Sequence, residues 1–237
     1  MENKHSELVK GHFDIKYKDY DTLIKKLIPK YEEMHDLILK NLHFKRKPKI
    51  RVLDLGIGTG KTSLEILKKF PDVTIDGVDI SKNMIKQGKQ RLRNYLSRVN
   101  FMEQDIAKLS LHGKYDAVVS VLCIHHLNQK QKKELFYKIF NLLKERGILI
   151  IADIVKFDSG RETTKKENEW KNFLIKNLGK KEGQYWFDNY KEEDLPDSVN
   201  NQLKWLKKAG FKEEKEIFKH MNYTTFYGKK WIITKIY

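Results

Sequence analysis

The sequence has little cysteine, little arginine and no long apolar run. Its 237 residues include one cysteine, Cys123, which excludes a disulfide framework and a cysteine-rich zinc site. The apolar stretches fall far below the roughly 20 residues that a membrane span needs. The N-terminal MENKHSELVKGHF has no apolar signal-peptide core. These absences predict a soluble, cytoplasmic protein.

The positive charge is carried almost wholly by lysine. There are 48 Lys and Arg against 32 Asp and Glu, a formal net charge of +16, yet only 7 of the 48 are Arg. Nucleic-acid readers rely on Arg for bidentate contacts with phosphate and guanine. The lysines run from Lys4 to Lys235 without a long basic block. A solvated lysine-rich surface is therefore favoured, and an RNA-binding face is the alternative.

The N-terminal 48 residues show helical periodicity. Apolar residues at spacings of three and four predict one helix ending near Ile28 and a second over residues 30–42, separated by Pro29. KRKPK, at residues 45–49, indicates a charged linker. With 40% hydrophobic residues, the chain can form a core without disulfides or a structural metal.

From residue 50 short apolar strands alternate with helices. The predicted strands cover residues 50–55, 74–80, 99–105, 115–123 and 147–155. The predicted helices cover residues 62–70, 81–96 (N-capped by Ser81) and 131–145. This alternation is typical of a parallel sheet with right-handed crossovers, covered on both faces.

The alternation breaks over residues 156–198, which are polar but include Trp170, Trp186 and Tyr190. We expect a helical insertion there, forming a lid over a substrate; a scaffold with its own small core is the alternative. Residues 199–210 form a predicted helix that ends at Gly210, and a terminal hairpin comes after it.

The most informative segment is VLDLGIGTG, residues 52–60, a strand followed by a glycine-rich turn. Such a turn lets the backbone approach a ligand, and the next helix offers its free N–H groups to an anion. A P-loop would need glycine at position 55, which is leucine, and a dinucleotide fingerprint would need glycine at 61, which is lysine. The glycines could also serve the turn alone.

This segment and the residues after it resemble the class I S-adenosylmethionine-dependent methyltransferases, most clearly over residues 50–155. The resemblance implies that Asp79 holds both ribose hydroxyls, that Asp105 and Ile106 contact adenine, and that YDAVVSVLCIHHL passes the methyl donor. The implied cofactor-binding residues are Tyr17, Tyr20, Asp54, Gly56, Gly58, Gly60, Asp79, Ile80, Met84, Asp105, Ile106, Ser120 and Val121. Tyr17 or Tyr20 would cover the sulfonium and methyl group, unless both are core aromatics.

The ends of the chain resemble small methyltransferases related to the group that makes carboxy-S-adenosylmethionine for tRNA wobble-uridine modification. The shared layout includes Ile28-Pro29 and the tail ending in Ala209-Gly210-Phe211. In that group an arginine shortly before this tail is taken to bind the extra carboxylate of the product. The matching position here is Trp205. This difference favours ordinary methyl transfer.

The candidate catalytic residues are His125, His126, Asp153 and Tyr20. One histidine could act as a general base near neutral pH, with Asp153 orienting a nucleophile, or it could only cap the next helix. A metal site is not expected, because adjacent histidines on a loop tend to point apart. Cys123 is expected to be an inert core residue of the fourth strand.

The sequence therefore predicts one α/β domain with a doubly wound, seven-stranded, mostly parallel sheet whose last strand is antiparallel. Its parts are an N-terminal helical cap (1–48), a cofactor-binding core (49–155), a helical lid (156–198) and a C-terminal helix and hairpin (199–237).

The predicted activity is methyl transfer from S-adenosyl-L-methionine, with S-adenosyl-L-homocysteine as product, to an O, N or S atom of a small molecule. The alternatives are a tRNA-modifying methyltransferase, a carboxy-S-adenosylmethionine synthase-like enzyme and a non-catalytic cofactor-binding subunit. The expected partner is the small-molecule substrate, tRNA being the alternative; no membrane partner is expected, and a monomer or a homodimer is equally compatible with the sequence.

Overall fold

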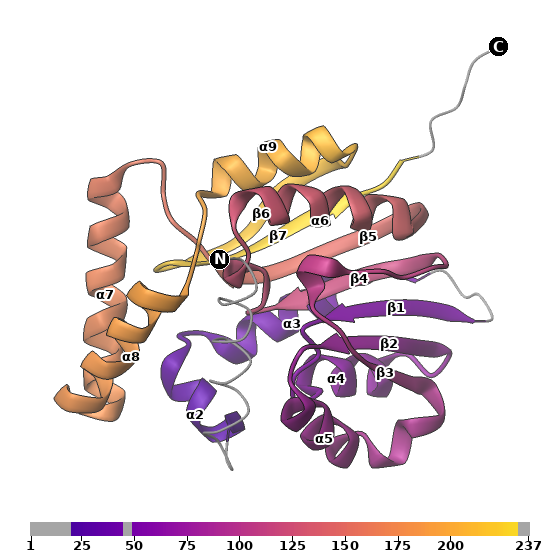
Figure 1. Cartoon of the computed structure of the whole chain (residues 1–237), viewed down its shortest axis with the longest axis horizontal. Coiled ribbons are helices and arrows are strands. Elements are labelled where there is room, and N and C mark those ends of the chain that lie inside the picture. The colour runs from indigo at the N-terminus through magenta and orange to yellow at the C-terminus, as the bar shows by residue number, and fades with distance from the viewer. Residues whose placement is uncertain (1–19, 45–48, 232–237) are drawn as a thin grey trace.

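The computed structural model describes residues 20–44 and 49–231, and its centre is one mixed sheet (Figure 1). Within that part of the chain the seven strands lie in the order β3-β2-β1-β4-β5-β7-β6. Their bounds are β1 Ile50–Leu55, β2 Val73–Asp79, β3 Val99–Glu103, β4 Tyr115–Val121, β5 Leu143–Ile154, β6 Lys212–His220 and β7 Tyr223–Lys229. Strands β1 to β5 are mutually parallel, and β7 runs antiparallel to β5 and β6. The predicted sheet, including its antiparallel last strand, is confirmed.

Alternating side chains of the strands form two cores, one on each face of the sheet. Val52 and Val119 point into one core and Leu53 and Val118 into the other, as the two-residue repeat of a strand requires. The first core also contains residues of helices α2 (Tyr20–Leu27), α3 (Tyr31–Asn41) and α4 (Lys61–Lys69). The second contains residues of α6 (Gln129–Leu142) and α9 (Val199–Ala209).

Local sequence explains several of the helix ends. Ser81 caps helix α5 (Lys82–Arg91) by accepting a hydrogen bond from the Met84 N–H, as predicted. Asn128 and Gln131 form a capping box at the start of α6, so neither neighbouring histidine is that helix's cap. Gly210, with φ of 111°, ends α9 as predicted.

Several predicted boundaries are wrong; the helix predicted over residues 81–96, for example, ends at Arg91. The helix predicted to reach residue 145 ends at Leu142, and β5 starts directly at Leu143, which pairs with Tyr115. The fourth strand ends at Val121 and not at residue 123. Leu122 has φ of 51° and turns the chain out of the strand, so that Cys123 lies beyond it.

The insertion forms two helices, α7 (Gly160–Leu178) and α8 (Lys180–Glu193), which lie side by side at one end of the sheet (Figure 1). The indole N–H of Trp170 in α7 donates a 2.8 Å hydrogen bond to the Leu27 carbonyl at the end of α2. This contact joins the insertion to the N-terminal helices. No helix among the described residues is long and apolar enough to cross a membrane.

Candidate functional site

The loop between β1 and α4 brings backbone close to the neighbouring strand ends. Gly56 has φ of 74° and Gly58 has φ of 52°, a region that disfavours other residues. A Cβ atom on Gly56 would lie 2.4 Å from the Sγ atom of Cys123. The N–H of Gly58 donates a 2.8 Å hydrogen bond to an oxygen of Asp79 at the end of β2. Glycine at position 56 is therefore required by both conformation and space.

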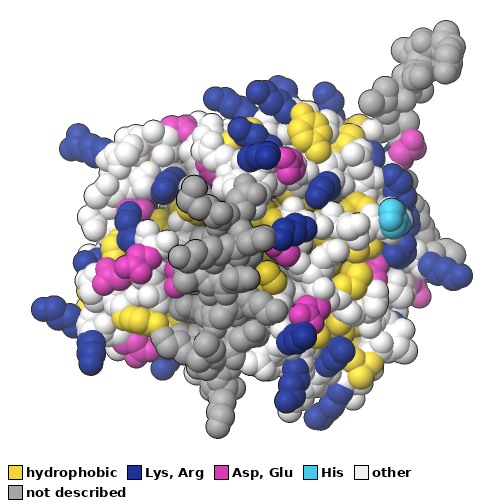
Figure 2. All heavy atoms as spheres, viewed as in Figure 1, with side chains coloured by type: hydrophobic (Ala, Val, Ile, Leu, Met, Phe, Trp, Pro, Cys, Tyr) yellow, Lys and Arg dark blue, Asp and Glu magenta, His cyan; other side chains and the backbone are white. Residues whose placement is uncertain are grey.

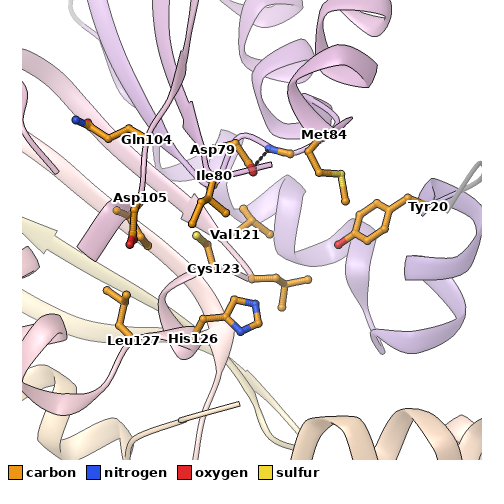
Figure 3. A pocket seen from close by; sticks show the side chains of 14 residues that line it. Tyr20, Asp79, Ile80, Met84, Gln104, Asp105, Val121, Cys123, His126 and Leu127 are labelled. Carbon is orange, nitrogen blue, oxygen red and sulfur yellow. Dashed lines mark hydrogen bonds between the residues drawn. The ribbon is translucent and has the colours of Figure 1, made fainter. Parts of the chain in front are cut away.

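A cavity of about 770 Å³, partly open to solvent, lies at the carboxyl ends of the parallel strands (Figure 3). We call it the strand-end cavity. This is where an open α/β sheet binds ligands, at the point where strand order reverses. It is lined by Tyr20, Gly56, Gly58, Asp79, Ile80, Met84, Gln104, Asp105, Ile106, Val121, Leu122, Cys123, His126 and Leu127.

Two carboxylates in this cavity are fixed by backbone donors. Asp79 accepts from the Gly58 N–H through one oxygen and from the Ser81 N–H, at 2.9 Å, through the other. Asp105, after β3, accepts a 2.8 Å hydrogen bond from the Ala107 N–H. A carboxylate oxygen has two acceptor positions, so both groups can also accept from a ligand's hydroxyl or amino group. Their arrangement suits an adenosine.

The structure places most of the predicted cofactor residues around the strand-end cavity, and three of them elsewhere. Asp54 is buried beneath the loop and accepts a 2.7 Å hydrogen bond from the Ser63 hydroxyl; burial raises the pKa of Asp54 to about 7. The Ser120 hydroxyl donates to the Leu55 carbonyl. Gly60 is the residue before α4 and packs against Leu92. Tyr17 lies outside the described residues.

Four residues of the cavity wall are not among the individually predicted site residues: Gln104, Leu122, Cys123 and Leu127. Gln104 stands directly before Asp105, and the other three lie within YDAVVSVLCIHHL, the segment already predicted to pass the methyl donor. Cys123 lies beyond the fourth strand, not in it as expected, but it packs against the second core. Burial and the nearby Asp79 carboxylate raise the pKa of its thiol well above the ordinary value, which favours the neutral form.

A second cavity, of about 760 Å³, adjoins the first; we call it the aromatic chamber. Tyr20, Leu122 and His126 line both cavities. The other residues of its wall are Ile24, Leu27, Ile28, His125, Ile154, Trp170, Trp186, Asn189, Tyr190, Glu193, Asp194 and Tyr223. Among these described residues two carry carboxylates and none is Lys or Arg.

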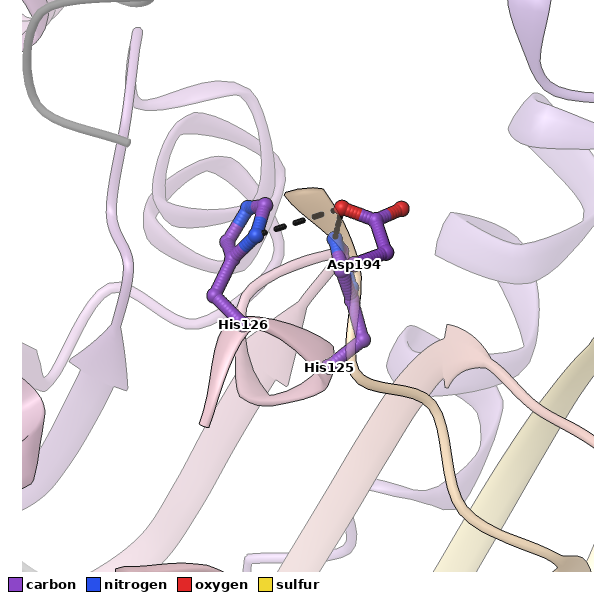
Figure 4. Close-up of side chains that lie close together, drawn as sticks. All are labelled: His125, His126 and Asp194. Carbon is purple, nitrogen blue, oxygen red and sulfur yellow. Dashed lines mark ion pairs between the residues drawn. The ribbon is translucent and has the colours of Figure 1, made fainter. Parts of the chain in front are cut away.

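A cluster of ionisable side chains lies where the two cavities meet (Figure 4). Asp153 in β5 accepts from the His125 N–H at 2.9 Å and from the His125 Nδ1–H. Oδ1 of Asp194 lies 3.6 Å from His125 Nε2 and 3.4 Å from His126 Nδ1. The two imidazole rings are 4.0 Å apart. The expectation that the two histidines point apart is therefore wrong.

The two histidines have opposite pKa shifts. Burial lowers the pKa of His125, but the carboxylates of Asp153 and Asp194 outweigh burial and raise it above the ordinary value. Burial and the neighbouring charge on His125 lower the pKa of His126. One ring of the pair therefore favours the protonated form and the other the neutral form.

Trp205 does not face either cavity. It is 8% exposed on α9, in the core that α9 shares with α6, and Lys133 lies over its ring at 5.0 Å. Trp205 is not among the described residues of either cavity wall, so the residue at this position does not decide between methyl transfer and the alternative reaction.

Comparisons with known proteins match the chain to one kind of domain. A protein-family profile described as "Methyltransferase domain" matches residues 52–147. The chain is 28% identical over 217 residues to a carboxy-S-adenosyl-L-methionine synthase of Campylobacter fetus subsp. fetus, covering 89% of this chain and 90% of the relative. It is 26% identical over 220 residues to the enzyme of that name from Nautilia profundicola, with the same coverage.

Solved structures share the fold. An O-methyltransferase family protein from Burkholderia thailandensis superposes with a TM-score of 0.64 at 20% identity, covering 84% of this chain and 56% of that one. Phosphoethanolamine N-methyltransferase 2 of Haemonchus contortus, solved with phosphomonomethylethanolamine and S-adenosylhomocysteine, gives 0.63 at 17% identity, covering 84% and 53%. The chain thus spans about half the length of these solved proteins. Residues 52–147 therefore carry a class I S-adenosylmethionine-dependent methyltransferase domain.

Proposed function

We propose that the strand-end cavity binds S-adenosylmethionine. Asp79 would accept hydrogen bonds from both ribose hydroxyls, and Asp105 would accept one from the adenine amino group. Ile80, Met84 and Ile106 supply apolar surface for the adenine ring. When bound, the cofactor supplies a methyl group that its sulfonium has already activated. The protein then needs mainly to align a partner with that group and keep water away.

The partner is a small molecule held in the aromatic chamber. The observation that carries this proposal is that the two cavities share Tyr20, Leu122 and His126 as wall residues. A molecule in the chamber therefore reaches the cofactor at this shared wall. The insertion supplies Trp170, Trp186 and much of the remaining wall, consistent with the lid role that the sequence favours.

His125 and His126 lie close enough to that wall to act on a proton of the bound partner. Asp153 would orient His125 through its Nδ1–H, leaving Nε2 directed toward the chamber. Tyr20 would cover the methyl group from the N-terminal side.

Formation of carboxy-S-adenosylmethionine is the reaction favoured by the relatives, which align over nine-tenths of both chains. In this reaction the sulfonium methyl group would lose a proton and form a carbon–carbon bond to CO₂. The chamber would hold an acid that releases this CO₂, and the basic fragment left by its decarboxylation would take up the proton. Trp205 no longer argues against it, since that side chain lies in the second core.

Methyl transfer to a small nucleophile is the second candidate, and the charge of the chamber favours it. Glu193 and Asp194 line the chamber, and no Lys or Arg stands among the described residues of its wall. Such a wall suits a neutral or cationic partner, for example an amine, better than an organic acid.

The nucleoside product separates the two reactions. The purified enzyme is incubated with S-adenosylmethionine and panels of organic acids or amines, and the products are identified by mass spectrometry. Carboxy-S-adenosylmethionine formed only with an acid supports the first reaction, whereas S-adenosylhomocysteine together with a methylated amine supports the second. Calorimetry first shows that the enzyme binds the cofactor. If that enzyme then forms neither product with any panel member, the proposal of a small-molecule partner of these classes is contradicted.

A further inference from the structure

We propose that His125, His126 and Asp194 bind one divalent transition-metal ion where the strand-end cavity and the aromatic chamber meet. Within the described chain these three side chains present one ligand atom each, and those atoms all lie within 4.8 Å of one another. They come from two segments far apart in sequence, the turn after β4 and the residue after α8. The metal would be a component of the site beyond the nucleoside cofactor.

The distances suit a compact ion. Oδ1 of Asp194 lies 3.4 Å from His126 Nδ1 and 3.6 Å from His125 Nε2. Ligand atoms bound at about 2.0–2.1 Å in a tetrahedral zinc site are about 3.3 Å apart. Two of the three separations therefore need only a few tenths of an ångström of movement. The rings, 4.0 Å apart and tilted by 53°, would close the third by small rotations.

The surroundings of His125 support ligation by Nε2. Its Nδ1–H donates to Asp153, and Asp153 also accepts from the backbone N–H groups of His125 and Ile154, both at 2.9 Å. A carboxylate that holds Nδ1–H of a histidine fixes the ring and leaves Nε2 for a metal, an arrangement found at most metal-binding histidines. Here Nε2 is the nitrogen that faces Asp194 (Figure 4).

The backbone holds the two ligand-bearing segments together. The N–H of Leu195, next to Asp194, donates a 2.9 Å hydrogen bond to the His125 carbonyl. The Asp194 N–H itself ends α8 by donating to the Tyr190 carbonyl at 3.1 Å. These bonds fix the backbone of Asp194 beside His125, so its carboxylate is presented to both rings from a held position in the chain.

The donor set selects the class of ion. Two imidazoles and one carboxylate suit Zn²⁺ or Fe²⁺, whereas Mg²⁺ and Ca²⁺ prefer oxygen donors alone. His126 lines both cavities, so coordination positions left open by the protein would face ligands in both. If the chamber holds an organic acid, as the first reaction proposed above requires, the ion would offset the charges of Glu193 and Asp194 and bind the acid's carboxylate.

The test measures metal binding directly. Protein freed of metal with a chelator is titrated with Zn²⁺ by calorimetry, and with Co²⁺ while its visible absorption is recorded. We expect one Zn²⁺ per chain and a Co²⁺ spectrum typical of nitrogen and oxygen ligands. His126→Gln and Asp194→Asn should each weaken Zn²⁺ binding by at least about tenfold, and Asp153→Asn by about 10- to 100-fold. His126 and Asp194 are 16% and 15% exposed, so these variants are expected to fold.

His43→Gln is the matched control, because it removes an exposed histidine at the end of α3 and should leave Zn²⁺ affinity unchanged. Circular dichroism checks that each variant is folded. The proposal is overturned if folded wild-type protein binds Zn²⁺ no more tightly than folded His126→Gln and Asp194→Asn. S-adenosylmethionine affinity, measured on the metal-free protein, tests the proposed function separately, because the cofactor's predicted contacts do not include the metal.

Discussion

Asp79 at the end of β2 accepts a 2.8 Å hydrogen bond from the backbone N–H of Gly58, in the loop that follows β1. Its second oxygen accepts from the N–H of Ser81, whose hydroxyl caps α5. One carboxylate thus connects the glycine loop, the second strand and the next helix. The cavity is shaped before a ligand arrives, which lowers the ordering cost of binding.

Alanine substitution should affect Gly56 and Gly58 differently. In Gly58→Ala the added Cβ atom has only one other atom within 4 Å, at 3.9 Å, so the space is open. Strain at the positive φ of this residue should lower the free energy of unfolding by about 1 kcal/mol and the Tm by about 2–4 °C. Gly56→Ala adds a clash with the Cys123 side chain at 2.4 Å and should cost about 2–5 kcal/mol. Thermal unfolding measures both, and equal losses would show that strain alone governs the loop.

The stability of the protein should fall in mild acid because of His35. This side chain is 2% exposed, contacts Tyr31 and Thr62, and has its pKa lowered to about 4, mainly by burial and also by Lys61. An unfolded histidine titrates near 6.5, so the unfolded state binds more protons between pH 6.5 and 4. Above pH 6.5 neutral His35 therefore makes its full contribution to the free energy of unfolding. As the pH falls toward 4 this contribution is lost, and the free energy of unfolding decreases by up to about 3 kcal/mol.

Denaturant unfolding from pH 7.5 to 4.5 measures this dependence. His35→Gln should be less stable at pH 7.5 but lose less stability on acidification than wild type. His112→Gln, at an exposed position, should keep the wild-type slope. Identical slopes for wild type and His35→Gln would assign the acid sensitivity to other groups.

Trp170 should support the chamber without supporting the strand-end cavity. Trp170→Phe keeps an aromatic ring but removes the N–H that donates to the Leu27 carbonyl, at a cost of about 1–3 kcal/mol. We expect a Tm lower by roughly 3–10 °C, with S-adenosylmethionine affinity within about twofold of wild type. Trp231→Phe, at a position 41% exposed, is the control. A loss of cofactor affinity as large as the loss of stability would contradict the division into two cavities.

The lysine-rich surface should bind tRNA only weakly. On the face shown in Figure 2, Lys and Arg side chains lie in separate groups with Asp and Glu between them. Gel shifts with bulk tRNA over a salt series should show at most weak binding that salt removes. Tight binding that persists at physiological salt would make tRNA the substrate to test first.

The sequence predicted the sheet well because its signals are local. The strand over residues 50–55 matches β1 residue for residue, and Ser81 and Gly210 mark helix ends through side-chain or conformational preferences that act within a few residues. The resemblance to class I methyltransferases singled out Asp79 and Asp105, and both line the cavity because the carboxyl ends of parallel strands meet at one edge.

The errors arose where tertiary packing decides. Leu122 adopts a positive φ that no local residue preference indicates, and this turn directs Cys123 to the cavity wall. The rings of His125 and His126 are brought together by Asp153 and Asp194, which are distant in sequence. The surroundings of Trp205 depend on how α9 packs against α6, a long-range contact that motif matching does not reveal.

The most direct test of the account is calorimetric titration with S-adenosylmethionine and S-adenosylhomocysteine. Wild type should bind both. Asp79→Ala removes the carboxylate expected to accept from the ribose and should weaken binding by about 10- to 100-fold. Asp72→Ala, seven residues earlier at an exposed position, should bind as wild type does. No binding by folded wild type, or equal binding by wild type and Asp79→Ala, would contradict the assignment of the strand-end cavity to this cofactor.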